Sequence, residues 1–217
     1  MSEILNPEDF IITRKRKKYK FAKFHNAENC FEFAEWQKRP VDVVEIGAGN
    51  GLFSVELAAR HPEQMFAAVD VKADRLQHGA YKALERGVTN IAFVRARADQ
   101  VDELFEANSL SQVWLTFPDP FPRSRSAGRR MTHPTFLAKY SGLLSSSGAL
   151  YLKHDDSAFF AWSLEQLVAE KWSIDQLAFD VHESVLDDDY KIMTTYEQRW
   201  LSEGKPTQFV RARLTAR

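Results

Sequence analysis

The hydrophobic pattern along the chain alternates between two kinds of segment. Short runs rich in Val, Ile, Leu and Phe are bounded by turn residues, as is typical of strands buried on both faces of a sheet. These runs cover residues 41–46, 65–70, 91–94, 112–117 and 149–153. Segments with helix-spaced apolar residues lie between them, at residues 52–60, 73–86, 99–106 and 134–144. The alternation predicts an α/β fold in which helices cover both faces of a doubly wound, mostly parallel sheet.

The last third of the chain departs from this alternation. Residues 159–170 keep helical spacing, whereas residues 173–181 and 207–214 alternate apolar with polar side chains. Such alternation is typical of antiparallel strands with one solvated face, and it brings the expected sheet to seven strands. The aspartate-rich segment 182–195 is the best candidate for a long loop.

The same pattern bears on domain organisation. At 217 residues, with 44% hydrophobic and 27% charged residues, the chain suits one globular domain of ordinary size. It contains no internal repeat and no linker that would separate a second domain. We expect one domain over residues 41–217, preceded by a basic N-terminal arm and a first helix within residues 1–40.

Charge is unevenly distributed, although the formal net charge is only −1. Residues 14–23 hold seven of the 29 basic residues and no acidic residue. Four more basic residues follow Asp119 in a stretch free of acids: Arg123, Arg125, Arg129 and Arg130. Clusters of this kind are the usual footprint of a surface that binds nucleic acid. For residues 14–23 alone, the alternative is a solvated basic tail.

Several observations bear on compartment and metal binding. Cys30 is the only cysteine, which excludes an internal disulfide and favours a reducing compartment. The six histidines show no metal-ligand spacing, so no metal site is expected. No apolar run reaches the roughly 18 residues needed to span a bilayer, and residues 1–20 lack a signal-peptide core. We expect a cytoplasmic protein that does not bind a membrane. We expect it to be a monomer or a homodimer.

The first predicted strand leads into the sequence EIGAGNG, whose glycines are Gly47, Gly49 and Gly51. Ligands of doubly wound sheets bind beyond the carboxyl ends of the strands, where this loop lies. A dinucleotide fingerprint would need a further glycine three residues after the second one, and a phosphate-binding P-loop would need Gly-Lys-Ser/Thr. Both features are absent. The glycines therefore serve a different ligand, which the backbone approaches closely because no Cβ intervenes.

Two acids beside this loop narrow the choice of ligand. Glu45 stands two residues before Gly47, where it would repel a pyrophosphate but suit a ligand with an ammonium and a sulfonium group. Asp70 ends the second strand, where an acid can accept hydrogen bonds from both ribose hydroxyls of an adenosine. Together they predict a site for S-adenosylmethionine. The plain alternative is a tight strand–helix turn with surface acids.

A further candidate site follows the strand predicted at residues 112–117. Asp119 stands between Pro118 and Pro120, whose fixed φ angles would hold its carboxylate at the strand's end. A carboxylate held in this way could accept hydrogen bonds from a nucleobase edge, or stabilise positive charge on a methylated ring nitrogen. The alternative is that Pro-Asp-Pro forms an ordinary turn.

Four motifs together resemble one known family. EIGAGNG, LTFPDPFPRSRSAGRRM, LKHDDS and TTYEQRW stand in the same order and spacing as in the bacterial tRNA (guanine-N7-)-methyltransferases, from about residue 40 to the C-terminus. The resemblance implies a Rossmann-like class I methyltransferase fold. It also implies methyl transfer from S-adenosylmethionine to N7 of a guanine in the tRNA variable loop.

The resemblance also implies a role for each matching residue. Glu45 and Asp70 would bind S-adenosylmethionine, with the three glycines shaping the loop. Asp119 would be the central catalytic acid, near both cofactor and guanine. The remaining matches are to residues that bind the substrate: Arg123, Asp155, Thr194 and Glu197.

One position departs from the family's pattern. Arg97 stands where many members have an acid that contacts the adenine side of the cofactor. Either Asp99 takes that role through a shifted loop, or the main chain at Arg97 and Ala98 binds the adenine while the Arg97 side chain points elsewhere. We favour the second interpretation, because backbone groups alone can bind the edge of a base.

Two other functions remain open from the sequence. One is a methyltransferase of the same fold that acts on another RNA position, a protein or a small molecule. The other is a catalytically silent RNA-binding module that retains a cofactor loop. The arginine clusters and the late Thr-Thr-Tyr-Glu sequence disfavour the first, and the intact acids Glu45, Asp70 and Asp119 disfavour the second.

Overall fold

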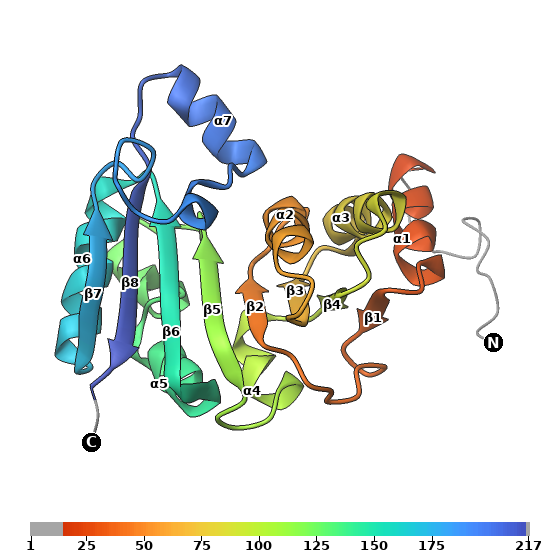
Figure 1. Ribbon diagram of the computed structural model, residues 1–217, viewed down its shortest axis with the longest axis horizontal. Coiled ribbons are helices and arrows are strands. Elements are labelled where there is room, and N and C mark those ends of the chain that lie inside the picture. Colours follow the sequence, from red (N-terminus) through yellow and green to blue (C-terminus); the bar gives the residue numbers. More distant parts are fainter. Residues whose placement is uncertain (1–14, 216–217) are drawn as a thin grey trace. The chain divides into compact units, whose positions relative to one another are not determined.

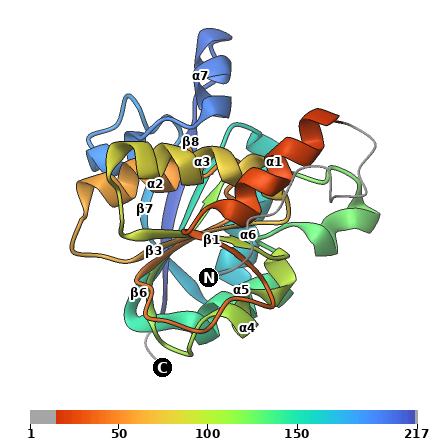
Figure 2. The same ribbon diagram turned by 90° about the vertical axis from the view of Figure 1, so that its right-hand side faces the viewer.

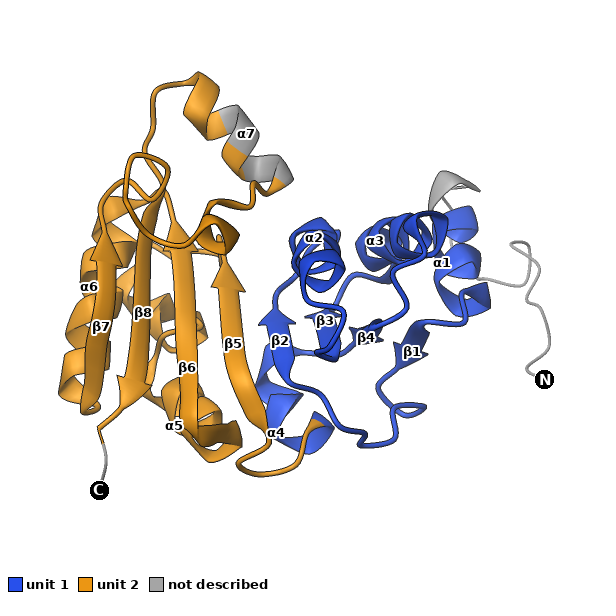
Figure 3. Ribbon diagram, in the orientation of Figure 1, with its two compact units in different colours: residues 1–104 blue, residues 105–217 orange. Residues whose placement is uncertain are grey.

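A computed structural model describes residues 15–215, except for the side chains of residues 15–17, 195, 196, 198 and 199. The chain divides into two compact units, residues 1–104 and residues 105–217 (Figure 3). Within the described range, each unit contains four strands together with helices. The α/β class predicted from the apolar pattern is confirmed.

The first unit is built around four parallel strands in the order β1-β4-β3-β2. These are β1 (Cys30–Glu32), β2 (Val43–Ile46), β3 (Phe66–Asp70) and β4 (Ile91–Arg95). The helices are α1 (Lys15–Asn26), α2 (Leu52–Arg60), α3 (Ala73–Arg86) and α4 (Val101–Leu104), with a 3-10 turn at Ala98–Gln100. Helices α1, α2 and α3 lie side by side, with α3 in the middle (Figures 1 and 2).

Helix α3 is held against the strands by small and apolar side chains. Leu76, Ala80 and Ala83 are fully buried. At Gly79 a Cβ atom would lie 2.3 Å from the carbonyl oxygen of Asn50, so only glycine lets the helix come this close to the loop after β2. The helix ends at Gly87, which adopts a left-handed φ of 68°.

The second unit contains strands in the order β5-β6-β8-β7. Its strands are β5 (Leu110–Thr116), β6 (Leu144–His154), β7 (Trp172–Ala178) and β8 (Gln208–Leu214). Its helices are α5 (Pro134–Leu143), α6 (Ser157–Ala169) and α7 (Thr195–Ser202), with 3-10 turns at Ser124–Arg129 and Asp188–Lys191. Strands β5 and β6 are parallel, whereas β8 runs antiparallel to both β6 and β7, which confirms the two late antiparallel strands (Figure 1).

Aromatic side chains form the core on one face of the second unit. Trp114 on β5 and Tyr151 on β6 are partners in register, and their rings stack with centroids 4.3 Å apart. Phe209 on β8 stacks on Tyr190 at 4.5 Å. Stacked rings remove large apolar areas from water, so this cluster fixes the three strands to the segment before α7.

Several element boundaries differ from the predicted ones. Helices α2 and α3 have the predicted bounds, but β6 begins at Leu144 where the apolar run indicated residue 149. The described residues form eight strands and not seven, because β1 adds a three-residue strand beside β4. The segment 182–195, expected as a loop, contains the 3-10 turn at Asp188–Lys191 and leads into α7.

The expected domain boundary at residue 40 stays a prediction. Helix α1 accounts for the first helix expected within residues 1–40, and its Phe24 side chain is buried. The basic run at residues 14–23 is described only in part. Arg14 lies outside the described residues, as do the side chains of residues 15–17.

Candidate functional site

The loop after β2 requires its three glycines. Gly47, Gly49 and Gly51 have φ angles of 77°, 59° and 68°, in the left-handed region that other L-residues avoid. At Gly51 a Cβ atom would also lie 2.7 Å from the ring of Phe93 on β4. The loop therefore turns directly from β2 into α2, and its backbone carries no side chain at these three positions.

The two acids of the first unit stand at the ends of neighbouring parallel strands. Glu45 lies on β2 with only 2% of its surface exposed, and the hydroxyl of Ser54 on α2 donates a hydrogen bond to its Oε2 atom. Asp70 ends β3 and is half-buried. Its Oδ2 atom accepts from the backbone N–H of Gly49 at 2.9 Å, and its Oδ1 atom accepts from that of Lys72 at 2.8 Å.

These contacts join the glycine loop to the second acid. Because Asp70 binds the N–H of Gly49, it fixes the loop as well as presenting a carboxylate beside it. Each carboxylate oxygen has two lone-pair directions, so both oxygens of Asp70 can accept a further hydrogen bond. Ser54 was not predicted as part of the site. A serine in the first turn of α2 has no distinguishing sequence pattern, so its contact with Glu45 could not be predicted.

Residues 97–99 follow the end of β4, whose last residue, Arg95, is the register partner of Asp70. The Arg97 guanidinium donates to both carboxylate oxygens of Asp99, at 2.9 and 2.7 Å, and both side chains are more than half exposed. The backbone N–H of Arg97 donates to Oε1 of Gln100 at 3.1 Å. The Asp99 carboxylate, one of the two candidates for the adenine contact, is therefore paired with the Arg97 side chain, whereas the other candidate is the main chain at Arg97 and Ala98.

In the second unit, Asp119 stands in a turn with unusual backbone angles. Phe117 and Phe121 have φ angles of 51° and 40°, rare for residues with bulky side chains. The N–H of Phe117 donates to the carbonyl of Lys153 at 2.9 Å, so the turn begins against β6. The Asp119 side chain is exposed at the carboxyl end of β5.

The four arginines after Asp119 fall into two groups. Arg123, Arg125 and Arg129 are exposed on or beside the 3-10 turn at Ser124–Arg129. Arg130 is half-buried and donates to the carbonyl oxygens of Pro120, at 3.1 Å, and Phe121, at 3.1 and 3.3 Å. Among the exposed three, Arg129 places its guanidinium carbon 4.3 Å from the ring centroid of Phe121, so both Arg129 and Arg130 contact the turn.

Asp155 follows β6 directly, and β5 and β6 are parallel neighbours. Within this unit, Asp119 and Asp155 therefore come after the carboxyl ends of adjacent strands. The last residue of β6 is His154, which is 3% exposed. Its Nδ1 atom accepts from the N–H of Asp156 at 2.8 Å and lies 3.6 Å from Oδ1 of Asp155. Its Nε2 atom lies 2.9 Å from the carbonyl oxygen of Pro118.

Thr194 and Glu197 form the N-terminal cap of α7. The Thr194 hydroxyl accepts from the N–H of Glu197 at 3.1 Å, and the Glu197 carboxylate accepts from the N–H of Thr194 at 2.9 Å. Glu197 is fully buried, and its carboxylate lies 2.8 Å from the ammonium of Lys153, which is also fully buried. His182 contacts the same carboxylate at 2.8 Å. Lys153 and His182 were not predicted from the sequence, because their partner lies far along the chain.

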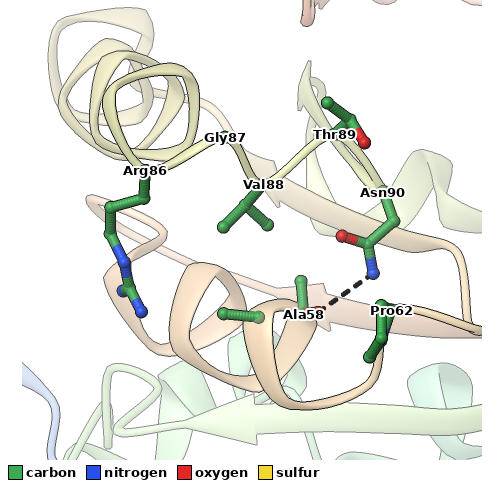
Figure 4. Close-up of a pocket in the computed structure, with 8 residues that line it drawn as sticks. Ala58, Pro62, Arg86, Gly87, Val88, Thr89 and Asn90 are labelled. Atoms are coloured by element: carbon green, nitrogen blue, oxygen red, sulfur yellow. Dashed lines mark hydrogen bonds between the residues drawn. The ribbon is translucent and has the colours of Figure 1, made fainter.

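A pocket of about 250 Å³ lies elsewhere in the first unit (Figure 4). Its walls come from the C-terminal ends of α2 and α3 and from the residues that precede β4. Asn90 borders it and donates to the carbonyl oxygens of Ala58, His61 and Gln64. Parallel strands begin at this end of the sheet, so the pocket is separate from the glycine loop and Asp70.

Two features are absent from the described residues, 15–215. No helix in this range has the length and apolar character needed to cross a membrane. In the same range, no group of three His, Cys, Asp or Glu side chains is placed to hold a metal ion.

Solved structures of other methyltransferases share this fold. The 16S rRNA methyltransferase KamB superposes with a TM-score of 0.62 at 15% identity, over 86% of this chain and 95% of that chain. Precorrin-6y C5,15-methyltransferase from Geobacter metallireducens GS-15 gives a TM-score of 0.54 at 14% identity, over 94% and 90% of the two chains. At such identities the likeness shows the fold alone, that of the class I methyltransferases.

Sequence comparison defines the family. Residues 39–210 match a family model described as "Putative methyltransferase". A tRNA (guanine-N(7)-)-methyltransferase from Brevibacillus brevis is 37% identical over 180 residues, which cover 81% of this chain and 83% of the relative. A protein of the same name from Christiangramia forsetii is 33% identical over 200 residues, covering 86% and 87%. The chain belongs to the tRNA (guanine-N(7)-)-methyltransferase family.

Proposed function

We propose that this chain transfers the methyl group of S-adenosylmethionine to N7 of a guanine in the variable loop of tRNA. The observation that carries the proposal is the 37% identity to a relative of that name over 81% of the chain. The cytoplasm is the proposed compartment. The reaction is an in-line displacement, so an enzyme accelerates it mainly through proximity, orientation and the placement of charge.

S-adenosylmethionine fits the residues around the glycine loop. Glu45 would bind the ammonium group of the cofactor, since its buried carboxylate lies on β2 two residues before the glycine loop and would be favoured by a cationic ligand. Asp70 would accept hydrogen bonds from the ribose hydroxyls through the lone pairs that Gly49 and Lys72 leave open. The three left-handed glycines let the backbone lie against the cofactor without a Cβ atom between them.

The adenine would be bound by the main chain at Arg97 and Ala98, with the N–H of Ala98 as the donor, because that of Arg97 donates to Gln100. The pairing of Arg97 with Asp99 agrees with this choice, because it turns the Arg97 side chain toward Asp99. An adenine contact by Asp99 would have to share its carboxylate oxygens with a guanidinium.

Asp119 would act on the guanine. The N1 and N2 hydrogens of guanine are donors, and one carboxylate can accept from both. The N7 lone pair forms the new bond to the methyl carbon while the S–CH₃ bond breaks and its electron pair returns to sulfur. N7 carries no proton to lose, so the product is a cation and the step needs no general base. A nearby carboxylate stabilises that developing charge.

The other substrate-binding residues would surround the same guanine. Arg123 is exposed and would contact a phosphate, which positions the RNA without reading its sequence. Asp155 lies at the neighbouring strand end and would contact the nucleotide directly. Thr194 and Glu197 would contribute through the start of α7, where their mutual hydrogen bonds and Lys153 hold the backbone in one conformation.

The proposal is tested with unmodified tRNA and isotopically labelled S-adenosylmethionine. After the reaction, the RNA is digested to nucleosides and the labelled nucleoside is identified by mass spectrometry. We expect 7-methylguanosine. Another methylated nucleoside would support a methyltransferase with a different RNA target, and no transfer combined with tRNA binding would support a silent binding module.

A further inference from the structure

The turn that carries Asp119 is held from both sides by basic side chains that come from later in the chain. His154, at the end of β6, contacts the carbonyl oxygen of Pro118 at 2.9 Å. Arg130 donates to the carbonyl oxygens of Pro120, at 3.1 Å, and Phe121, at 3.1 and 3.3 Å. The peptide carbonyls on both sides of Asp119 are therefore fixed.

The hydrogen-bonding role of His154 follows from its second contact. Its Nδ1 atom accepts from the N–H of Asp156 at 2.8 Å, so the ring proton is on Nε2 and is donated to Pro118. The ring is packed against Phe159 with centroids 4.5 Å apart. Burial lowers the pKa of His154, which favours the neutral ring over the charged one.

Arg130 also has a second contact that fixes its side chain. Its guanidinium carbon lies 4.3 Å from the ring centroid of Trp162 on α6, within the range of a cation–π contact. The planar guanidinium donates to the two carbonyls from two separate nitrogen atoms, Nε and Nη2, whereas a lysine ammonium has a single nitrogen. The role of Arg130 thus differs from that of the exposed arginines that precede it.

The turn needs external support for two reasons. Residues 118, 120 and 122 are prolines without an N–H group, so carbonyl oxygens are the main backbone groups by which other residues can hold the segment. In addition, Phe117 and Phe121 both adopt left-handed φ angles, which are unfavourable for aromatic residues and persist only where surrounding contacts enforce them.

We propose that His154 and Arg130 are positioning residues for methyl transfer, which hold the Pro118–Phe121 turn so that the Asp119 carboxylate keeps one orientation. This inference rests on the proposed function, in which Asp119 acts on the guanine. In this role His154 donates its Nε2 proton to the carbonyl of Pro118, and Arg130 donates to the carbonyls of Pro120 and Phe121.

Two substitutions at residue 154 separate this role from simple packing. The amide nitrogen of His154→Gln can take the place of Nε2 and donate to Pro118. His154→Asn instead retains an acceptor near the Nδ1 position for the N–H of Asp156 and loses the donor to Pro118. We expect His154→Asn to lower the single-turnover methylation rate about tenfold or more, because misplacing a reacting group by 1 Å costs up to about a hundredfold. His154→Gln should recover most of that loss.

Arg130→Lys provides the matching test on the other side. It retains the positive charge but loses the paired donors to Pro120 and Phe121. We expect a fall in the single-turnover rate with little change in tRNA affinity. If Arg130 serves as a phosphate contact, lysine preserves both rate and affinity, and that result overturns its assignment as a positioning residue.

Hydrogen exchange of the segment 117–131 gives a readout that does not depend on catalysis. We expect faster exchange in His154→Asn and Arg130→Lys than in wild type, and near wild-type exchange in His154→Gln. Equal rates and equal exchange in both residue-154 variants overturn the inference. A wild-type protein that forms no 7-methylguanosine refutes the proposed function instead, while the exchange comparison still decides whether these residues hold the turn.

Discussion

The buried pair formed by Lys153 and Glu197 makes a strong prediction about stability. Both side chains are fully buried, and the Glu197 carboxylate accepts hydrogen bonds from the Lys153 ammonium, at 2.8 and 3.0 Å, and from the N–H of Thr194. Glu197→Gln keeps the shape and one acceptor oxygen for Thr194. The buried ammonium of Lys153 then keeps its hydrogen bond to the carbonyl of Ile192, at 2.8 Å, but loses its carboxylate partner.

Removing one partner of a buried ion pair costs about 3–5 kcal/mol, because the remaining charge stays buried without compensation. We therefore expect Glu197→Gln to lower the free energy of unfolding by about 3 kcal/mol, a large share of the 5–15 kcal/mol typical of a folded protein. Urea denaturation followed by tryptophan fluorescence measures this change. Lys153→Met combined with Glu197→Gln should cost less than the sum of the two single changes, since the double variant contains no unpaired charge.

Glu203→Gln is the matched control, because Glu203 lies just after the same helix and pairs with Lys205 at the surface, at 3.5 Å. Exposed pairs contribute about 0–1 kcal/mol, so this variant should unfold almost as wild type does. If Glu197→Gln is no more destabilising than Glu203→Gln, the buried pair does not stabilise this part of the fold, and the reasoning is refuted.

Three further predictions concern cofactor, RNA and pH. Glu45→Ala and Asp70→Ala should each weaken S-adenosylmethionine binding by about 1–3 kcal/mol in calorimetric titration, the cost of losing charged hydrogen bonds; unchanged affinity in both would remove the cofactor assignment. Neutralising residues 14–18 should weaken binding of all tRNAs similarly and reduce its salt dependence, because fewer counterions are released; an unchanged salt slope would make this run a solvated tail. Because burial lowers the pKa of His154, this group contributes stability that is fully present above its unfolded pKa of about 6.5 and is lost as pH falls through the folded pKa. His154→Gln should therefore flatten the dependence of unfolding free energy on pH below about 6.5, and an unchanged slope would contradict the buried neutral ring.

Local patterns predict the fold of this chain well where each element is long and its contacts are close in sequence. Helices α2 and α3 have the predicted bounds because of their apolar spacing and because a glycine marks one end of each, Gly51 before α2 and Gly87 after α3. Strand β1 has only three residues, too few for a periodic signal, and its pairing with β4 decides its conformation. The start of α7 does have a local signal, since Thr194 and Glu197 stand at the spacing of a capping box.

The candidate site shows a similar division. The three glycines and the acids at strand ends can be chosen from the sequence, because a parallel sheet places them at one edge. The contacts that support these residues cannot be chosen from the sequence. His154 reaches Pro118 from 36 residues away, and Lys153 reaches Glu197 across 44 residues. Such pairs depend on strand register, which the one-dimensional pattern does not specify.

The central claim is that the Asp119 carboxylate acts in the transition state, and single-turnover kinetics of Asp119→Asn test it most directly. The variant keeps the size of the side chain but loses its charge and turns an amide N–H₂ toward the donors of guanine. We predict a fall in the methylation rate of about a hundredfold or more, as expected for the loss of one electrostatic stabiliser. The tRNA dissociation constant should change far less, because phosphate contacts dominate it. A variant that methylates guanine at near wild-type rate would contradict the account and reduce the Pro-Asp-Pro element to a structural turn.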